Sequence, residues 1–330
     1  MAISLLEIPD LPMEMITNYC DFPTIQALRK ACRDLRNFID DKKPDVYPEP
    51  LKITVERGAI ALDLTNGDHL EMYPEGSRIY LRYVGNEVYW IRSDGQRKKI
   101  LEWENLFFQD FGLLLDNQPK FFNQVSFHFS YSDGPFYITK FEEFLKTRTR
   151  IPIPTKSVII SVSTKSQSLQ LLPYIDPKHL ESLEIVLHGR YNMPKDVSKI
   201  EDTEQWKVAR KLEMLKAVLK PTVPIEKFRH FLVVNIQYET LEVENVKECK
   251  ELFLQFTDYK KHFTLGSVGF IPRDLFDGVF GDDVNTLPKK WYFKAEKNLE
   301  KVLQITMDSV FFEFKFVERS EVSNGVLIID

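Results

Sequence analysis

The sequence contains little cysteine and little glycine for its length. Its three cysteines, Cys20, Cys32 and Cys249, are widely spaced among 330 residues and form no CxxC pair. An odd count without metal-ligand spacing argues against a secreted disulfide framework and against a zinc site. With 13 glycines, the chain also has few loops that could cradle a phosphate. We therefore expect reduced thiols, a cytoplasmic and/or nuclear protein, and no metal or cofactor.

Long apolar runs and an excess of basic residues are also absent. No run of 18 apolar residues occurs, so we expect no membrane-spanning helix. Glu7 and Asp10 interrupt the short apolar run near the N-terminus, which lacks the basic start of a signal peptide. The formal net charge of −5 gives no global attraction to nucleic acid or to an anionic membrane. Neither is expected as a partner.

Recognisable catalytic motifs are missing too. The six histidines are His69, His128, His179, His188, His230 and His262, and none lies in an HExxH motif or beside a Gly-x-Ser-x-Gly elbow. Four residues near two glycines could suggest calcium: Asp277, Asp282, Asp283 and Asn285. Their spacing does not fit an EF-hand loop, and Gly-Asp-Asp is common in turns. We expect no catalytic residue and no enzyme; a hydrolase would need a nucleophile–base pair within hydrogen-bond reach.

Apolar residues are abundant in a pattern that predicts helices near the N-terminus. Hydrophobic residues make up 43% of the chain, which includes 25 phenylalanines, so we expect a large folded core. Pro12 and Pro23 each suit the first turn of a helix. The second helix is predicted to run from Thr24 to about Ile39, with one apolar stripe formed by Ile25, Leu28, Cys32, Leu35 and Ile39. Helices this short need a partner surface to bury their stripes.

The order of motifs in residues 5–43 resembles the F-box. Leu-Pro-x-Glu-x-Ile is followed by an Asp-Phe-Pro turn and by LRKACRDLRNFID. The resemblance is to the nematode F-box proteins that carry a C-terminal FTH domain (the F-box A type). It implies a helical module that docks on a Skp-family adaptor of a cullin–RING ubiquitin ligase. The implied adaptor-binding residues are Leu11, Pro12, Met15, Ile16, Leu28, Cys32 and Leu35.

One departure from the F-box pattern weakens this expectation. The interval between Leu11-Pro12 and Ala31-Cys32 is shorter than the family's by roughly one helical turn of 3.6 residues. Tyr19 and Cys20 are left in place of the missing apolar residues. The alternative is therefore a decayed F-box protein that binds or sequesters a ligand without recruiting a ligase. A DNA-binding helix-turn-helix is disfavoured because basic and acidic residues nearly cancel in residues 1–43.

Three prolines in residues 44–50 predict a linker between two domains, 1–43 and 51–330. Alternation of apolar and polar residues over 51–92 predicts antiparallel strands, with turns at Asn66-Gly67, Glu75-Gly76 and Gly85-Asn86. A helix over 98–115 is expected to pack on them. The fold class is thus α+β, with a small N-terminal helical module followed by an antiparallel sheet and irregular strand–helix units that are leucine-rich-repeat-like.

From residue 125 onward, strands and helices are expected to alternate. Strands are predicted at 125–131, 157–162, 183–187, 231–236, 262–268 and 310–316, the last of the chain. Helices are predicted at 140–146, 168–175, 202–219 and 243–256. The four tryptophans and most phenylalanines are expected in the core. Residues 271–309 give the weakest pattern.

Three of these segments resemble the FTH domain that follows the F-box in the same family: 171–187, 204–215 and 228–256. The resemblance implies that this region holds an unknown protein substrate. The function expected is a substrate-recognition adaptor whose partners are a Skp-family protein, its cullin scaffold and a target. Such a protein acts through proximity, because it raises the target's effective concentration at the ubiquitin-charged enzyme. No substrate-binding residue is predicted.

Overall fold

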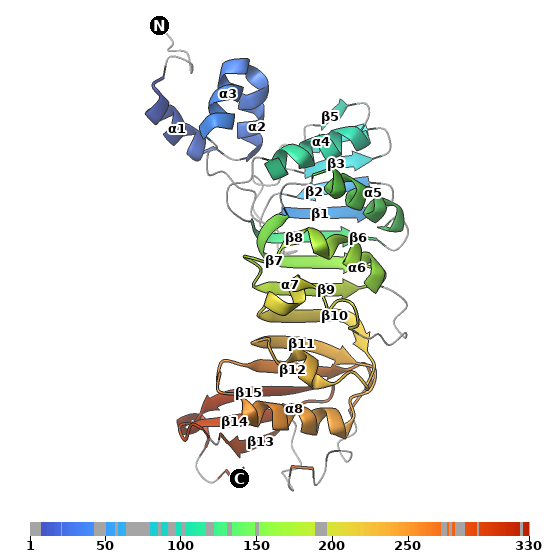
Figure 1. The fold of residues 1–330 in the computed structure, drawn as a ribbon, viewed down its shortest axis with the longest axis vertical. Helices are drawn as coiled ribbons and strands as arrows, with labels where there is room; N and C mark the ends of the chain where they lie inside the picture. The colour runs from blue at the N-terminus through green and yellow to red at the C-terminus, as the bar shows by residue number, and fades with distance from the viewer. Residues whose placement is uncertain are drawn as a thin grey trace. The chain divides into compact units, whose positions relative to one another are not determined.

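The chain folds into two compact units, Met1–Ser157 and Val158–Asp330, in a computed structural model (Figure 1). The residues that the structure describes are 8–20, 22–42, 51–56, 59–63, 80–84, 87–91, 97–100, 103–116, 122–130, 134–148, 152–188, 197–271, 276, 279–280, 288–295, 297–323 and 326–329. The predicted linker at 44–50 and the candidate calcium residues lie outside these ranges. The predicted domain division at residues 44–50 therefore stays a prediction.

Three short helices begin the first unit: α1 (Asp10–Asn18), α2 (Phe22–Ala31) and α3 (Arg33–Lys42). The predicted single helix from Thr24 to Ile39 is therefore wrong, because it breaks at Cys32. The Cys32 side chain accepts a hydrogen bond from the Leu35 N–H at 3.5 Å, and the Cys32 carbonyl accepts one from the Arg36 N–H at 3.2 Å. These two bonds give acceptors to N–H groups in the first turn of α3, so Cys32 acts as the N-cap of that helix.

The strands of the first unit are β1 (Leu51–Glu56), β2 (Ala59–Asp63), β3 (Tyr80–Val84), β4 (Glu87–Ile91), β5 (Arg97–Ile100) and β6 (Phe122–Phe129). The antiparallel pairing predicted for 51–92 is confirmed for β1 through β4, and the predicted turns lie outside the described residues. The helix predicted over 98–115 begins later than expected, because residues 97–100 form β5. The predicted antiparallel sheet is incomplete, because β6 pairs with β1 in parallel.

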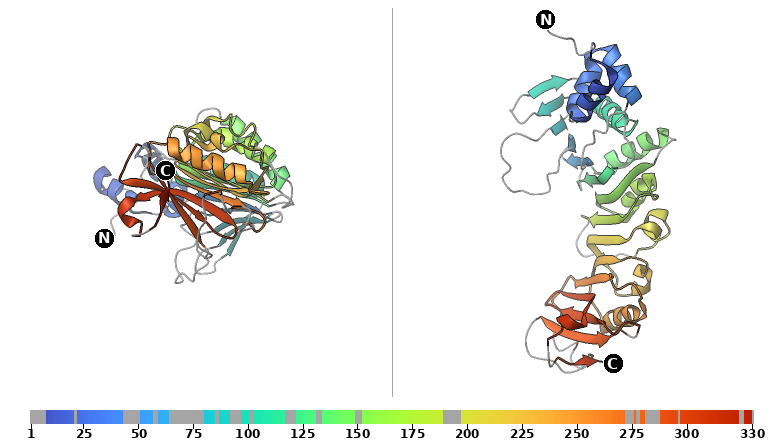
Figure 2. Two further views of the ribbon diagram at one scale, coloured as in Figure 1. Left: turned by 90° about the horizontal axis from the view of Figure 1, so that it is seen from below. Right: turned by 90° about the vertical axis from the view of Figure 1, so that its left-hand side faces the viewer.

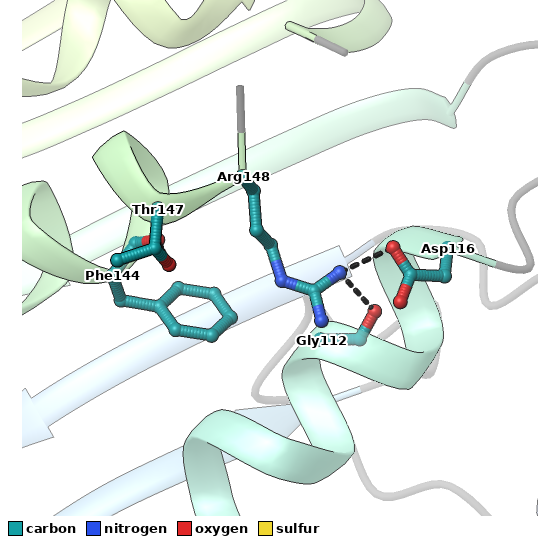
Figure 3. Close-up of polar contacts among 5 residues, drawn as sticks. All are labelled: Gly112, Asp116, Phe144, Thr147 and Arg148. Carbon is teal, nitrogen blue, oxygen red and sulfur yellow. Dashed lines mark hydrogen bonds and ion pairs between the residues drawn. The ribbon is translucent and has the colours of Figure 1, made fainter. Parts of the chain in front are cut away.

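Two aromatic-rich helices, α4 (Trp103–Asp116) and α5 (Gly134–Thr147), are joined by ring contacts. The ring of Phe141 lies 5.4 Å from that of Phe107 and 5.9 Å from that of Phe111, and all three are fully buried. Arg148, just after α5, closes one end of this contact (Figure 3). Its guanidinium donates to the Gly112 carbonyl at 2.7 Å and pairs with Asp116. Aromatic packing and one cation thus fasten α5 to α4.

From residue 153, across the unit boundary after Ser157, strands alternate with helical segments. In chain order these are β7 (Ile153–Val162), α6 (Lys165–Leu171), η2 (Leu172–Tyr174), β8 (Ile175–Asp176), β9 (Ser182–Leu187), α7 (Glu204–Val208), β10 (Lys211–Leu219), η3 (Ile225–Phe228), β11 (Val233–Tyr238), α8 (Val243–Gln255) and β12 (His262–Ser267). Strands β9, β10, β11 and β12 pair in parallel in that order. The α-helices lie on one side of these strands (Figure 2), where alternate strand residues are buried.

The helix predicted over 202–219 is wrong, and its second half is strand β10. Only Glu204–Val208 is helical, with the Thr203 side chain accepting from the Trp206 N–H as an N-cap. Residues KLEMLKAVL favour a helix by local propensity. In the fold they pair with strands on both sides, so hydrogen bonding and burial of Leu212 and Met214 outweigh that propensity.

The unit ends in β13 (Lys289–Lys294), β14 (Lys301–Met307), β15 (Phe311–Glu318), η5 (Arg319–Glu321) and β16 (Ile328–Ile329). β12, β15, β14 and β13 pair antiparallel in that order, and β16 pairs with β13 in parallel. The prediction missed β13 and β14, and the strand it placed last, β15, is followed by β16. Helices together with strands of mixed direction confirm the α+β class. The leucine-rich-repeat comparison stays a prediction.

Among the described residues, no helix is long and apolar enough to cross a membrane. In the same ranges, no group of three or more His, Cys, Asp or Glu side chains is arranged to hold a metal ion.

Candidate protein-interaction surface

Helix α1 has two faces with opposite environments. Pro9 caps its N-terminus and accepts the Met13 N–H at 3.1 Å, and Pro12 lies in the first turn. Met13 is 4% exposed and Thr17 is fully buried, with its hydroxyl donating to the Glu14 carbonyl. Residues four apart lie on one side of a helix, so these two side chains fix which side of α1 faces the interior.

The outer side of α1 is apolar and exposed. Leu11 is 70% exposed, Met15 57%, Ile16 40% and Tyr19 89%. Together with exposed Pro12 they form a continuous strip at three- and four-residue spacing, here called the α1 strip. Single exposed apolar residues are ordinary on protein surfaces, but a contiguous set that lines one helix face marks an interaction site.

The predicted adaptor-binding residues do not all lie on one exposed surface. Leu11, Pro12, Met15 and Ile16 belong to the α1 strip, whereas Leu28 and Cys32 are half-buried. Leu35 is 6% exposed and lies in the interior with Ile25 and Ile39. The apolar stripe read from the sequence is divided because the break at Cys32 turns α3 back on α2. Leu35 therefore stabilises the helical module and offers little surface to a partner.

A cation fixes the angle between α2 and α3. Arg29, 9% exposed, donates to the Asp40 carboxylate at 2.7 Å. Arg36 of α3 donates to the carbonyl of Arg29 at 3.1 Å. A hydrogen bond between charged groups, with one of them buried, is stronger and more directional than a surface ion pair. This contact has no sequence signal, because an arginine and an aspartate eleven residues apart have no fixed geometry before the helix break is known.

A second surface lies on the strands of the second unit, on the face opposite the helices. Its half-buried residues follow the strand register: Glu184, Glu213, Asn235, Thr264 and Glu313 occupy one row across neighbouring strands. Lys211 pairs with Glu213 at 2.6 Å. Glu313 accepts from Lys315 at 2.9 Å and contacts His262 at 3.0 Å. The face is polar and largely charge-paired, with Val186 and Leu215 as neighbouring apolar positions.

The charges around Glu313 shift its acidity. Burial alone would raise the pKa of this carboxyl. The hydrogen bond and charge of Lys315, together with His262, outweigh burial and hold the pKa below its usual value. Glu313 is therefore ionised at neutral pH and links β12 to β15.

One Ser–His contact bears on the hydrolase alternative. The Ser161 hydroxyl and His188 Nε2 are within hydrogen-bond reach. Burial and then the positive charge of Lys216 lower the pKa of His188. A general base must become an imidazolium when it accepts the serine proton, and a nearby lysine opposes that charge. Ser161 is also only 2% exposed. The pair is better suited to joining β7 and β9 than to attacking a substrate.

Comparison with family models gave a match to residues on both sides of the boundary between the two units. Residues 136–276 match the FTH domain. This FTH domain begins in α5 and extends past β12, and it contains all three segments in which the sequence resembles it. Comparisons with curated proteins and with solved structures gave no match. An FTH domain is thus found, and it belongs to a family associated with F-box proteins.

Proposed function

We propose that this protein is a substrate-recognition adaptor that links a target protein to a Skp–cullin–RING ubiquitin ligase. The FTH domain at 136–276 supports the proposal, because its family is associated with F-box proteins. The observation that carries it is the α1 strip. Its five exposed apolar residues include four of the positions implied to bind the adaptor: Leu11, Pro12, Met15 and Ile16.

The mechanism needs no reacting side chain in this chain. Burial of the α1 strip in an apolar groove would hold the chain on the adaptor, since removing apolar surface from water drives most protein association. A target bound elsewhere on the chain is then kept near the ubiquitin-charged enzyme at high effective concentration. The FTH domain is the proposed site for that target.

The second candidate is a decayed F-box protein that binds a ligand without recruiting a ligase. Two observations favour it. Helix α1 has only nine residues, in keeping with the shortened interval in the sequence. Leu35, one of the implied adaptor contacts, is in the interior. Both reduce the apolar area available to an adaptor.

Affinity purification with mass spectrometry distinguishes the two candidates. The wild-type chain should recover a Skp-family adaptor and a cullin, and the double variant Leu11→Ala with Pro12→Ala should lose both. Asn37→Ala, an exposed position on α3, is the matched control and should recover the adaptor as the wild type does. A wild-type chain that recovers a target but no adaptor would instead support the sequestering protein.

A further inference from the structure

Tyr19 has the largest exposed fraction of the α1 strip. It is 89% exposed, against 70% for Leu11 and 57% for Met15. These three residues are spaced by four, so they lie in one row along the helix. Tyr19 is the last of the row and lies one position beyond the end of α1 at Asn18. The row therefore ends in an aromatic ring that is exposed to solvent.

The backbone of Tyr19 keeps helical geometry although α1 ends before it. Its φ of −92° and ψ of −7° lie in the right-handed helical region. Its N–H is donated to the carbonyls of Ile16 at 3.2 Å and Met15 at 3.3 Å. The backbone sets the direction in which a side chain leaves a helix. The point from which the ring extends is therefore fixed relative to the rest of the α1 strip.

Cys20 has a different environment from Tyr19. From the sequence, both residues stand in place of the apolar residues of the shortened interval. The Cys20 thiol donates to the Ile16 carbonyl at 3.2 Å, one turn back along the helix, and Cys20 is half-buried. Its side chain is thus turned towards α1. Of the two residues, Tyr19 is the one that extends the apolar row outward.

The chemistry of tyrosine suits a binding anchor. Its ring offers a large apolar surface, and tyrosine is enriched among the residues that dominate interface energies. Only two side-chain torsions are restricted when it is buried, so the loss of conformational entropy is small. A groove that received Leu11 and Met15 and then ended would leave this ring in water. The complementary groove continues past the end of α1.

We propose that Tyr19 anchors the chain in an adaptor whose apolar groove continues past the end of α1 into a pocket for an aromatic ring. This role rests on the proposed function, because it takes the adaptor as the partner of the α1 strip. Tyr19 is not among the adaptor-binding residues that the F-box resemblance implies. It is an additional contact, in the place where the shortened interval would otherwise leave the strip without an apolar side chain.

The test is calorimetric titration of the full chain with a purified Skp-family adaptor. Tyr19→Ala should weaken binding at least about tenfold, as loss of an interface anchor does. Tyr19→Phe keeps the ring and should bind within about threefold of the wild type, since a single hydrogen bond contributes little net free energy. Cys20→Ser keeps a donor for the Ile16 carbonyl and is the matched control; it should bind as the wild type does.

Hydrogen exchange over residues 10–18 separates a binding role from a structural one. Tyr19→Ala should leave the protection of the α1 amides unchanged, because the ring is exposed. Loss of that protection would assign the ring to the helix and overturn the proposal. Adaptor binding that is equal in the wild type and Tyr19→Ala, or equally weak in Tyr19→Phe and Tyr19→Ala, also overturns it and leaves the proposed function intact. A wild-type chain that binds no Skp-family adaptor overturns both.

Discussion

At the scale of single residues, the Arg148 guanidinium occupies the space that a side chain at position 112 would need (Figure 3). A Cβ atom on Gly112 would lie 2.2 Å from Arg148 Nη2, closer than atoms approach. The guanidinium also lies 5.1 Å from the centre of the Phe144 ring. Any larger residue at 112 must therefore displace the cation from Asp116, from the Gly112 carbonyl and from this ring.

A double-mutant cycle measures this dependence. Alanine within a helix is more favourable than glycine by about 1 kcal/mol. With Arg148→Ala already present, Gly112→Ala should therefore stabilise the chain by about that amount. In the wild-type background the gain should disappear or reverse, because the displaced guanidinium loses two hydrogen bonds, worth about 1 kcal/mol each. Urea unfolding of the four proteins gives the coupling. Equal effects of Gly112→Ala in both backgrounds would show that the two residues do not interact.

Glu313 predicts a pH-dependent contribution to stability. Because its pKa is lower in the folded chain than in the unfolded chain, its ionised form stabilises the fold. That contribution is complete above the unfolded pKa of about 4.3 and is lost as the pH falls through the lower folded value. Glu313→Gln should therefore cost about 1 kcal/mol or less at pH 7, since the group is partly exposed. The cost should shrink below about pH 4.3.

The measurement is urea unfolding of the wild type and Glu313→Gln between pH 7 and pH 3. Glu184→Gln, in the same row of the sheet, is the comparison variant. A difference between wild type and Glu313→Gln that grows as the pH falls would have the wrong sign for a carboxyl with a lowered pKa.

At the scale of elements, α1 shows how a short helix can serve two roles. Met13 and Thr17 are buried, while the residues of the α1 strip are exposed. Leu11→Ala should change local stability by less than about 0.5 kcal/mol, the usual range for surface substitutions. Met13→Ala should cost about 2 kcal/mol or more, because it leaves a cavity.

Hydrogen exchange over residues 10–18 reports both effects directly. Protection of α1 amides should fall sharply in Met13→Ala and stay near the wild-type level in Leu11→Ala. Equal loss of protection in both variants would mean that Leu11 is buried against the module, which would remove the α1 strip as a docking surface.

Sequence patterns predicted some helices and strands correctly and missed others. Helix α8 follows from its apolar spacing, and β11 and β12 follow from their alternation, because local pattern and tertiary environment agree there. β10 was missed because its leucines and lysines favour a helix, and only its neighbours on both sides make it a strand. β13 and β14 were missed because mixed charged and aromatic residues hide their alternation.

The candidate interaction surface was also predicted only in part. The order of Leu11, Pro12, Met15 and Ile16 on one helix face follows from spacing alone. The interior position of Leu35 does not, because it depends on the interruption at Cys32 and on the Arg29–Asp40 contact. Sequence patterns show which residues share a helix face, but not where a helix breaks when a cysteine can cap the next one.

At the scale of the whole molecule, the proposed function requires two surfaces in one chain. The first unit carries the α1 strip, and the FTH domain at 136–276 is the proposed target-binding region. Adaptor binding and target binding should therefore be separable by mutation. Variants of the α1 strip should lose the ligase and keep the target.

The most direct test is isothermal titration calorimetry of the purified full chain with a purified Skp-family adaptor. The proposed function predicts saturable binding with a negative heat-capacity change, the signature of apolar burial. It also predicts loss of that binding in Leu11→Asp with Met15→Asp, with the circular dichroism spectrum unchanged. A folded wild-type chain that binds no such adaptor, or a double variant that binds it equally well, would contradict the proposed function.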